Sequence, residues 1–433
     1  MDTIFAAATG TGAISVIRVS GPDAGAAVAA MTRSQAPPAR LASLRTFQSA
    51  GGETLDHGLV LWFPAPASFT GEDMAEFHGH GGRAAQAALL DALAALPGLR
   101  PAEPGEFSRR AFVNGKLDLT AAEGLADLVA AETEMQRRQA LRQLGGAFAA
   151  QVEGWRSALI NALARVEAAI DFADEDLPQG LDREGQRAIG GLLQDIDSHL
   201  SDARRGERLR SGIHVVILGP PNVGKSTLLN ALARREAAIV SATAGTTRDL
   251  IEVHLDLAGY PVTVVDTAGL RESADDIERE GVRRALARAE DADLKLLMTA
   301  PDLPLAAAPD SDTLLLLNKT DRLAGPPPAE IAGHPALPLS LKTGAGVEAV
   351  LAALTAAVAE RFGQIGSGGP TRERHRAALA DCRDRLAAAL DRTEPELIAA
   401  ELRLAARALG RITGVVDVED VLDRIFAEFC IGK

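Results

Sequence analysis

The chain has 433 residues, of which 47% are hydrophobic but only 3% aromatic, and it carries a formal net charge of −14. That length suffices for roughly two to four domains with cores of their own, and the Ala-rich composition favours aliphatic, largely helical cores. Such an acidic chain is not expected to hold nucleic acid by charge alone, so an RNA partner would need a local basic patch or a second protein.

The N-terminal sequence, the cysteine count and the lengths of the apolar stretches indicate the cellular compartment in which the protein works. The two cysteines, Cys382 and Cys430, are too few for a disulfide framework and indicate a reducing environment. The N-terminus carries Asp2 and no basic leader, so a signal peptide is not expected. No stretch approaches the roughly 18 uninterrupted apolar residues of a membrane span. We therefore expect a cytoplasmic protein that does not enter a membrane.

Residues 1–116 alternate short β-like runs with turn signals. The runs 13–19 and 59–63 predict strands, and 84–96 predicts a helix. This mixture is typical of a compact α+β domain.

From 117 to 211 the pattern changes to long amphipathic helices. Apolar residues recur there at intervals of three and four, at Leu125, Leu128, Leu141, Leu144, Phe148 and Val152. Thr120 with Glu123 predicts a capping box at the start of one of these helices.

The run GPPNVGKS at 219–226 lies between an apolar run, 215–218, and a helical run, 227–234. This strand, loop and helix order is the context that a phosphate-binding loop requires. Its glycines let backbone N–H groups turn toward phosphates at a helix N-terminus. Lys225 is expected to reach the terminal phosphates, and the Ser226 hydroxyl to bind Mg2+. The other predicted nucleotide contacts in this loop are Asn222, Val223, Gly224 and Thr227.

Three later motifs follow in the order of a guanine-nucleotide site. Asp266 opens the sequence DTAG (Asp266, Thr267, Ala268 and Gly269) directly after the apolar run 262–265, where a carboxylate that supports Mg2+ belongs. The sequence NKTD, with Asn318, Lys319 and Asp321, follows the apolar run 314–317, and the sequence SLK (Ser340, Leu341 and Lys342) comes where a loop supports the base. The Asp321 carboxylate would accept from guanine N1–H and N2–H2, which are donors that adenine lacks. Together these motifs predict a Ras-like P-loop G domain over 212–362, which hydrolyses GTP.

The group that activates water for hydrolysis is less evident. After DTAG comes Leu270, whose apolar side chain cannot orient water as the glutamine of Ras-like enzymes does. Glu278 is a candidate, with a solvated carboxylate on a helix face as the alternative. Thr247 is the expected second Mg2+ ligand, and Arg248 is either an arginine finger or a structural arginine. Asn222 would hold a monovalent cation against the phosphates or would serve only as a turn residue.

Residues 363–433 return to a helical pattern. Thr393 with Glu396 predicts another capping box, and Gly410 predicts a helix end. The last helix places apolar residues on one stripe, at Val418, Leu422, Ile425, Phe426 and Phe429. The simplest arrangement is one discontinuous all-α domain, formed by 117–211 and 363–433, into which the G domain is inserted. Two separate helical units are the alternative.

The chain resembles the MnmE (TrmE) family of tRNA modification GTPases over essentially its whole length. Beyond the G domain, the resemblance rests on DTI at 2–4, VIRVSG at 16–21, SFTGED at 68–73, GHGG at 79–82, FS at 107–108, AF at 111–112, NGKLDL at 114–119 and FCIGK at 429–433. The loop at 8–12 is shorter than the family pattern, and Leu341 stands where the family more often has Ala.

The resemblance implies a multidomain α/β protein with a distinct function for each part. The N-terminal domain would dimerise and bind a tetrahydrofolate one-carbon donor, either 5-formyl- or 5,10-methylene-tetrahydrofolate. The homodimer would act with an FAD-containing partner, MnmG, which also brings in NADH. The two proteins would add an aminomethyl or carboxymethylaminomethyl group to C5 of wobble uridine 34 of certain tRNAs. GTP hydrolysis would be stimulated by K+ as the G domains dimerise.

The resemblance also implies site residues by motif position. K+ would lie at Asn222, Ser241, Thr243 and Thr246, and Mg2+ at Ser226 and Thr247, with Ser241, Thr246 and Thr247 also contacting GTP. Glu278, twelve positions beyond Asp266, matches the family's water-orienting glutamate.

The folate residues implied by the resemblance are Arg18, Glu76, Lys116 and Lys433. Cations suit a glutamyl tail, and a carboxylate suits the donors of a pterin ring. Cys430 matches the family's C-terminal cysteine and would be a catalytic thiol near the folate, with a buried structural thiol as the alternative. A prenylation box is rejected because Lys433 is an atypical last residue and no polybasic run precedes it.

Two other functions compete with this interpretation. One is a ribosome-assembly or signalling GTPase that acts as a switch on rRNA, although no RNA-binding module is recognisable. The other is a folate-dependent aminomethyltransferase whose G domain is only regulatory.

Overall fold

The structure, a computed structural model, describes residues 2–171, 183–235, 237–239, 252–266, 292–363, 369–416, 419–427, 429 and 432. The chain divides into two compact units. One comprises Met1–Ala126, Gln143–Gly190 and Asp384–Lys433, and the other comprises Asp127–Arg142 and Gly191–Arg383.

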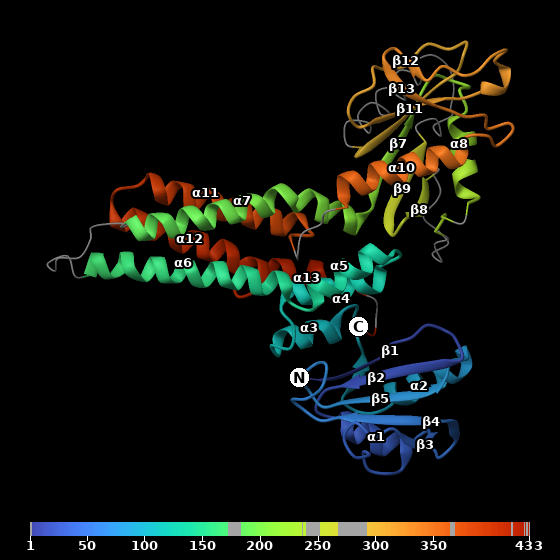
Figure 1. The fold of residues 1–433 in the computed structure, drawn as a ribbon. Helices are drawn as coiled ribbons and strands as arrows, with labels where there is room; N and C mark the ends of the chain where they lie inside the picture. Colours follow the sequence, from blue (N-terminus) through green and yellow to red (C-terminus); the bar gives the residue numbers. More distant parts are fainter. Residues whose placement is uncertain are drawn as a thin grey trace, which may run out of the picture. The chain divides into compact units, whose positions relative to one another are not determined.

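The first unit contains a six-stranded sheet with the order β3-β4-β5-β2-β1-β6 (Figure 1). Its strands are β1 (Thr3–Ala7), β2 (Ile14–Ser20), β3 (Ser43–Gln48), β4 (Thr54–Phe63), β5 (Met74–His80) and β6 (Leu99–Pro101). Helices α1 (Ala24–Thr32) and α2 (Arg83–Ala94) pack on one face, where they share an apolar core with Ile17, Val19 and Phe77. The predicted α+β domain is confirmed, with both predicted strands and the predicted helix in place.

The other face of this sheet carries polar side chains. Because successive residues of a strand point to opposite faces, Arg18 lies on the face away from Ile17 and Val19. Strands β2 and β5 are antiparallel, and their register pairs Arg18 with Glu76. The sheet therefore brings together two predicted folate residues that lie far apart in the sequence.

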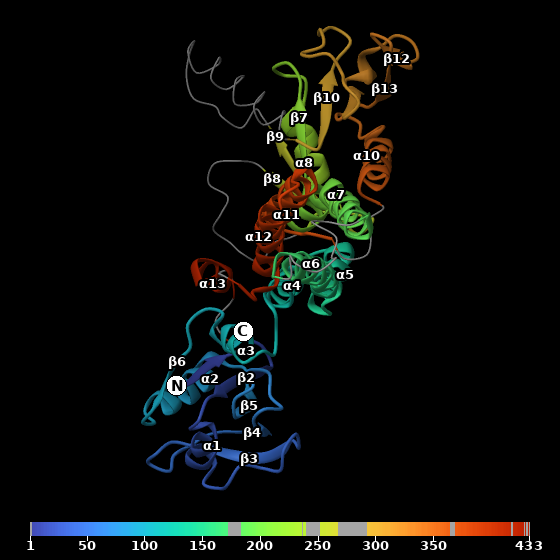
Figure 2. The ribbon, with the colours of Figure 1, turned by 90° about the vertical axis from the view of Figure 1, so that its left-hand side faces the viewer.

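Helices make up the rest of the first unit. After α3 (Glu106–Val113) come α4 (Leu119–Ala130), α6 (Ala147–Asp171), α12 (Pro395–Thr413) and α13 (Glu419–Ala427). Helices α6 and α12 run alongside each other in both ribbon views (Figure 1, Figure 2). Both bury leucines, such as Leu159 and Leu402, and each fully buried leucine contributes roughly 1.5–3 kcal/mol. Segments on either side of the G domain thus share one helical core.

The apolar stripe predicted for the last helix is confirmed for Leu422, Ile425 and Phe426 of α13, which pack in a cluster with Leu119 of α4. Phe429 is buried in the same cluster, but it follows the helix end at Ala427, so its predicted place on the helix was wrong. Val418 lies outside the described residues.

Both predicted capping boxes were wrong. Helix α4 begins at Leu119, and its first turn is capped by Asp118, whose Oδ1 accepts from the backbone N–H of Ala121 at 2.9 Å and from the Thr120 hydroxyl at 2.6 Å. Thr120 is therefore inside the helix. Helix α12 begins at Pro395, so its N-cap position is Glu394 rather than Thr393, and that residue makes no side-chain cap hydrogen bond.

Two other helix predictions were also wrong. Gly410 lies within α12, which continues to Thr413 and ends at Gly414 in the left-handed region (φ 91°). The Gly410 carbonyl accepts the N–H groups of Gly414 and Val415, a bonding pattern that closes a helix. Leu141 does not join an apolar face, since 42% of it is exposed.

The second unit is built on a seven-stranded sheet with the order β12-β13-β11-β10-β7-β9-β8. Its strands are β7 (Ile213–Leu218), β8 (Glu252–Leu257), β9 (Tyr260–Asp266), β10 (Leu294–Thr299), β11 (Thr313–Leu317), β12 (Glu330–Ile331) and β13 (His334–Pro338). The five strands from β13 to β9 are parallel, and β12 and β8 are antiparallel edges. Central parallel strands are covered on both faces, which explains the continuous apolar runs in β7 and β11.

Helices α8 (Lys225–Ala233) and α10 (Val347–Phe362) contribute to the core of this sheet. The remaining helices are α5 (Glu134–Leu144), α7 (Arg183–Ser211) and α11 (Glu373–Asp391). In the part of the chain that the structure describes, no helix has the length and apolar character needed to cross a bilayer.

Candidate guanine-nucleotide site

The predicted nucleotide motifs meet at one edge of the seven-stranded sheet. The carboxyl ends of parallel strands share an edge, and in open α/β sheets ligands bind there. The phosphate loop follows β7, Asp266 ends β9, and Asn318 follows β11. Ser340 comes two residues after the end of β13. Four motifs spread over 122 residues, from 219 to 340, therefore lie along one edge.

The phosphate loop depends on two glycines. Gly219 and Gly224 have positive φ angles of 147° and 114°, a region that other residues rarely adopt. A Cβ at Gly219 would lie 2.5 Å from the carbonyl oxygen of Met298, and one at Gly224 would lie 2.5 Å from the Asn318 amide nitrogen. The loop can take this path only because both positions lack side chains.

Lys225 begins α8 and reaches back across the loop. Its ammonium donates to the carbonyl oxygens of Gly219, at 2.8 Å, and Pro220, at 3.2 Å. Burial lowers the pKa of Lys225, and the nearby Asp266 carboxylate opposes that shift. A cation beside the free N–H groups of a helix N-terminus forms a binding site for phosphate.

Ser226 and Asp266 place two oxygen ligands next to the phosphate loop. The Ser226 hydroxyl donates to Asp266 Oδ2 at 2.6 Å, and Asp266 is 1% exposed. The Ser226 hydroxyl in the first turn of α8 and the Asp266 carboxylate at the end of β9 fit Mg2+, which prefers hard oxygen ligands and is shared with substrate phosphates. The predicted Mg2+ ligand Ser226 and its supporting carboxylate are therefore in contact.

Asn318 joins the phosphate loop to the loop that supports the base. Its amide nitrogen donates to the Val223 carbonyl at 2.7 Å, and its amide oxygen accepts from the Leu341 N–H at 3.2 Å. Asn318 is only 3% exposed, so these two hydrogen bonds satisfy an amide that lies away from water. Its side chain fixes the spacing between the phosphate end and the base end of the site.

Asp321 lies in a short 3-10 helix, Thr320–Arg322, that starts after Lys319 in the left-handed region (φ 62°). The Ser340 hydroxyl donates to Asp321 Oδ1 at 2.7 Å, and this hydrogen bond holds the pKa of Asp321 below its usual value. The carboxylate is exposed and remains ionised near neutral pH, as an acceptor for two guanine donors must.

The remaining predicted residues of this site are either exposed around it or outside the described residues. Asn222 is exposed in the left-handed region (φ 59°), and Thr227 is exposed in the first turn of α8. Lys342 directly follows Leu341, whose backbone N–H donates to the Asn318 amide oxygen. The predicted residues outside the described part are Ser241, Thr243, Thr246, Thr247, Thr267, Ala268, Gly269, Glu278, Cys430 and Lys433, as are Arg248 and Leu270.

The first unit holds the other predicted site. Arg18 Nε donates to Glu76 Oε1 at 2.9 Å, and the other Glu76 oxygen lies 3.0 Å from His78 Nε2. The hydrogen bond with His78, together with Arg18, lowers the pKa of Glu76 against the opposing effect of burial. The Arg18 guanidinium also lies 5.8 Å from the centroid of the Phe69 ring, within the range of a cation–π interaction.

Lys116 lies close to the same loop as Phe69. A Cβ at Gly71 would be 3.5 Å from Lys116 Cγ. Arg18, which is paired with Glu76, and Lys116 thus both lie beside the loop 68–73. One carboxylate and two cations fit a ligand that has both pterin donors and a carboxylate tail.

Sequence reasoning missed the polar side chains that hold this loop. The hydroxyls of Ser20 and Thr70 are 2.7 Å apart, and Ser20 also donates to Glu72 at 2.8 Å. Arg110 donates to Glu72 at 3.1 Å, and Asn114 donates to the Thr70 carbonyl at 2.7 Å. All but Arg110 lie in the motifs that carry the family resemblance, which is the signal that could have identified them.

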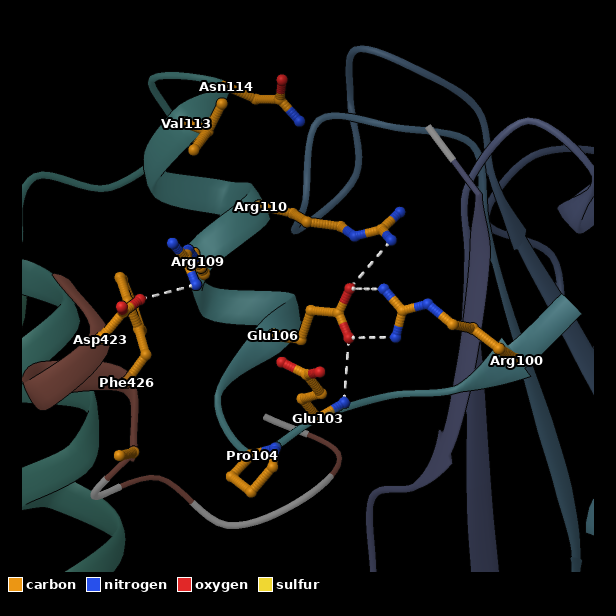
Figure 3. A pocket seen from close by; sticks show the side chains of 11 residues that line it. Arg100, Glu103, Pro104, Glu106, Arg109, Arg110, Val113, Asn114, Asp423 and Phe426 are labelled. Carbon is orange, nitrogen blue, oxygen red and sulfur yellow. Dashed lines mark hydrogen bonds and ion pairs between the residues drawn. The ribbon is translucent and has the colours of Figure 1, made fainter. Parts of the chain in front are cut away.

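A separate cavity of about 550 Å³ lies between α3 and α13 in this unit (Figure 3). The Glu106 carboxylate lies in this cavity and accepts hydrogen bonds from both terminal guanidinium nitrogens of Arg100, at 2.9 and 2.6 Å, and from Arg110, at 3.0 Å. Arg109 pairs with Asp423 at 3.0 Å across the cavity. Arg18, Glu76 and Lys116 do not line it, so these three predicted folate residues lie outside this cavity.

The second unit has the fold of a P-loop GTPase, with its nucleotide motifs in the expected order along one sheet edge. Comparison with known proteins assigns the whole chain to a particular family. The family described as "GTP-binding protein TrmE N-terminus" matches residues 3–116, and "MnmE helical domain" matches residues 119–430. The chain belongs to the MnmE (TrmE) family.

Full-length relatives agree with this assignment. The chain is 57% identical over 444 residues to the tRNA modification GTPase MnmE of Paramagnetospirillum magneticum, covering 100% of both proteins. It is 55% identical over 450 residues to the protein of that name from Parvibaculum lavamentivorans, again over 100% of both. Among solved structures, the G domain of the T. maritima FeoB iron transporter is 24% identical and matches with a TM-score of 0.25, covering 35% of this chain and 99% of that one.

Proposed function

We propose that this protein hydrolyses GTP to support modification of tRNA. With an FAD- and NADH-using partner, MnmG, it adds an aminomethyl or carboxymethylaminomethyl group to C5 of the wobble uridine of certain tRNAs. The carbon comes from 5-formyl- or 5,10-methylene-tetrahydrofolate. The observation that carries the proposal is one chain with two sites: the guanine-nucleotide site and the Arg18–Glu76 pair on a separate sheet.

The proposed organisation follows from those two sites. Residues 1–116 bind folate and dimerise, residues 117–211 and 363–433 form one helical domain, and residues 212–362 form the G domain. The side-by-side packing of α6 with α12 supports a single helical domain over two separate units. The protein acts as a cytoplasmic homodimer.

In the proposed hydrolysis, Lys225 neutralises charge on the terminal phosphates while Asp321 selects the base. Ser226 and Thr247 hold Mg2+, which bridges phosphate oxygens and offsets their charge when bound. Glu278 orients the attacking water. Asn222, Ser241, Thr243 and Thr246 hold K+, which supplies the positive charge that an arginine finger would otherwise bring.

GTP hydrolysis is expected to be faster in K+ than in Na+, and the Asn222→Ala variant is expected to lose that difference. The Asn222 side chain is exposed on the phosphate loop, but its backbone has φ 59°, a conformation that Ala adopts less readily than Asn. GTP affinity of the variant is therefore measured in parallel, and it should stay near the wild-type value if the loop is intact. Initial rates in matched chloride salts provide the measurement, with Asn230→Ala, an exposed position in α8, as the control. Equal wild-type rates in the two salts would refute the K+ assignment.

The C-terminal residues are proposed to complete the folate site. A methyl group at Gly432 would overlap the carbonyl oxygen of Ala7, at the end of β1, and the residue before it, Ala6, pairs with Arg18. This contact supports the proposal that Lys433 lies beside the folate. It also supports the proposal that the Cys430 thiol reacts there.

Titration with 5-formyl-tetrahydrofolate tests the folate part of the proposal. Arg18→Ala is expected to weaken binding about 10- to 100-fold, the usual cost of a lost charge-assisted hydrogen bond. Arg83→Ala is the matched control, because Arg83 is exposed at the start of α2 on the other face of the sheet. Absence of binding to the wild-type protein would favour the alternative of a GTPase switch without one-carbon chemistry.

A further inference from the structure

We propose that Asn114 is a positioning residue for the folate site: its side chain holds the loop Ser68–Asp73 so that Arg18 and Lys116 face one ligand. The inference rests on the proposed folate function and goes beyond it by assigning a residue that does not itself touch the ligand.

The first step is the attachment of the loop. Asn114 Nδ2 donates to the Thr70 carbonyl oxygen at 2.7 Å. The Thr70 side chain is fully buried, and its hydroxyl lies 2.7 Å from that of Ser20 on β2. Thr70 is therefore held from the sheet through its side chain and from the end of α3 through its backbone.

The second step links this attachment to Arg18. Phe69 directly precedes Thr70, and its ring lies 5.8 Å from the Arg18 guanidinium carbon. Gly71, on the other side of Thr70, has φ 80°, and a Cβ there would be only 3.0 Å from Asn114 Cβ. The loop backbone is thus packed against Asn114, and a shift of the loop would move the ring beneath Arg18.

The third step links it to Lys116. Asn114 is the C-cap residue that follows α3, and its side chain extends from the helix end toward the neighbouring loops (Figure 3). Two residues later, the Lys116 N–H donates to the Ala111 carbonyl at 2.8 Å, which ties Lys116 to the same helix end. One hydrogen bond therefore joins the segment that carries Lys116 to the loop that supports Arg18.

The Asn114→Asp variant tests the inference because it keeps the shape of the side chain and removes the donor. Above the pKa of the introduced carboxyl, an acceptor faces the Thr70 carbonyl, and the dissociation constant for 5-formyl-tetrahydrofolate is expected to rise about tenfold. GTP hydrolysis should not change, since Asn114 is in the other unit from the nucleotide site. Asn161→Asp, at an exposed position of α6, carries the same change in charge and should bind as the wild type does.

A pH series separates positioning from simple destabilisation. The introduced carboxyl would be part-buried against a carbonyl oxygen, and both features raise its pKa above the ordinary value of about 3.9. As the pH falls from about 8 to about 4.5, a growing fraction of the carboxyl takes up a proton, and its O–H can again donate to Thr70. The difference in affinity between Asn114→Asp and the wild type should then become smaller. It is expressed at each pH as a ratio of the two dissociation constants, so that protonation changes shared by both proteins cancel. A deficit that persists at every pH together with a lowered melting temperature would make the role structural and overturn the inference.

Two other outcomes also decide against it and are distinguishable. If the wild-type protein and Asn114→Asp bind the folate equally well, the positioning role is wrong while the folate site stands. If the wild-type protein does not bind the folate, the proposed function fails, and the inference fails with it.

Discussion

An Asp321→Asn variant is expected to lose affinity for GTP and to gain affinity for xanthosine triphosphate. The Asp321 carboxylate would accept from guanine N1–H and N2–H2, and an amide would set its own N–H2 against the second of these donors. Sites that lose a required hydrogen-bond partner discriminate by on the order of 10⁴-fold. Xanthine carries an oxygen at C2 in place of the amino group, so the introduced amide would pair with it.

The hydrogen-bond partner of Asp321 should let the Asp321→Asn variant change its base specificity from guanine to xanthine while the side chain keeps its position. The Ser340 hydroxyl, 2.7 Å from Asp321 Oδ1, can still donate to an amide oxygen and hold the new side chain in place. Nucleotide titrations with GTP and xanthosine triphosphate provide the measurement. Asp302→Asn is the control, because Asp302 is an exposed residue paired with Arg322 at 3.2 Å. Unchanged GTP affinity in Asp321→Asn would show that another residue selects the base.

A Lys225→Ala variant is expected to lose GTP hydrolysis. The ammonium lies within 3.2 Å of two carbonyl oxygens of the phosphate loop, so it is held where charge develops on the terminal phosphates. Removal of one preorganised group of this kind typically lowers the rate by about 10²- to 10³-fold. Single-turnover hydrolysis at saturating GTP separates this loss from weaker binding.

Lys295→Ala is the matched control for Lys225→Ala. Lys295 is a lysine of the same unit, but its ammonium pairs with Asp310 at 2.6 Å on the surface. The control should hydrolyse GTP at the wild-type rate. A Lys225→Ala variant with the same rate as the control would show that the phosphate loop is not the hydrolytic site.

The position of the nucleotide motifs at one sheet edge could be predicted from the sequence because each motif follows a parallel strand. Strand order and the shared carboxyl edge then bring Lys225, Asp266, Asn318 and Ser340 together without further information. What the pattern did not reveal is the double role of Asn318, which joins the two ends of the site through Val223 and Leu341. That role depends on contacts between residues that are 95 positions apart for Val223 and 23 positions apart for Leu341.

Helix ends and the folate loop were harder to predict for a related reason. The cap of α4 is decided by the path on which the chain enters the helix, and this path selects Asp118 rather than Thr120. On α5 the sequence pattern favoured Leu141 for burial, whereas Gln143 is buried and donates to the Thr120 carbonyl at 3.1 Å. Local periodicity carries no information about such long-range hydrogen bonds.

Nucleoside analysis of tRNA from living cells tests the central claim most directly: GTP turnover at this site serves modification of the wobble uridine. The comparison uses a strain that lacks the chain, and the same strain supplied with the wild-type protein, Lys225→Ala or Lys295→Ala. Mass analysis should show C5-aminomethyl-type uridine only with the wild-type protein and Lys295→Ala. Modified uridine at normal abundance in the strain that lacks the chain would contradict the account.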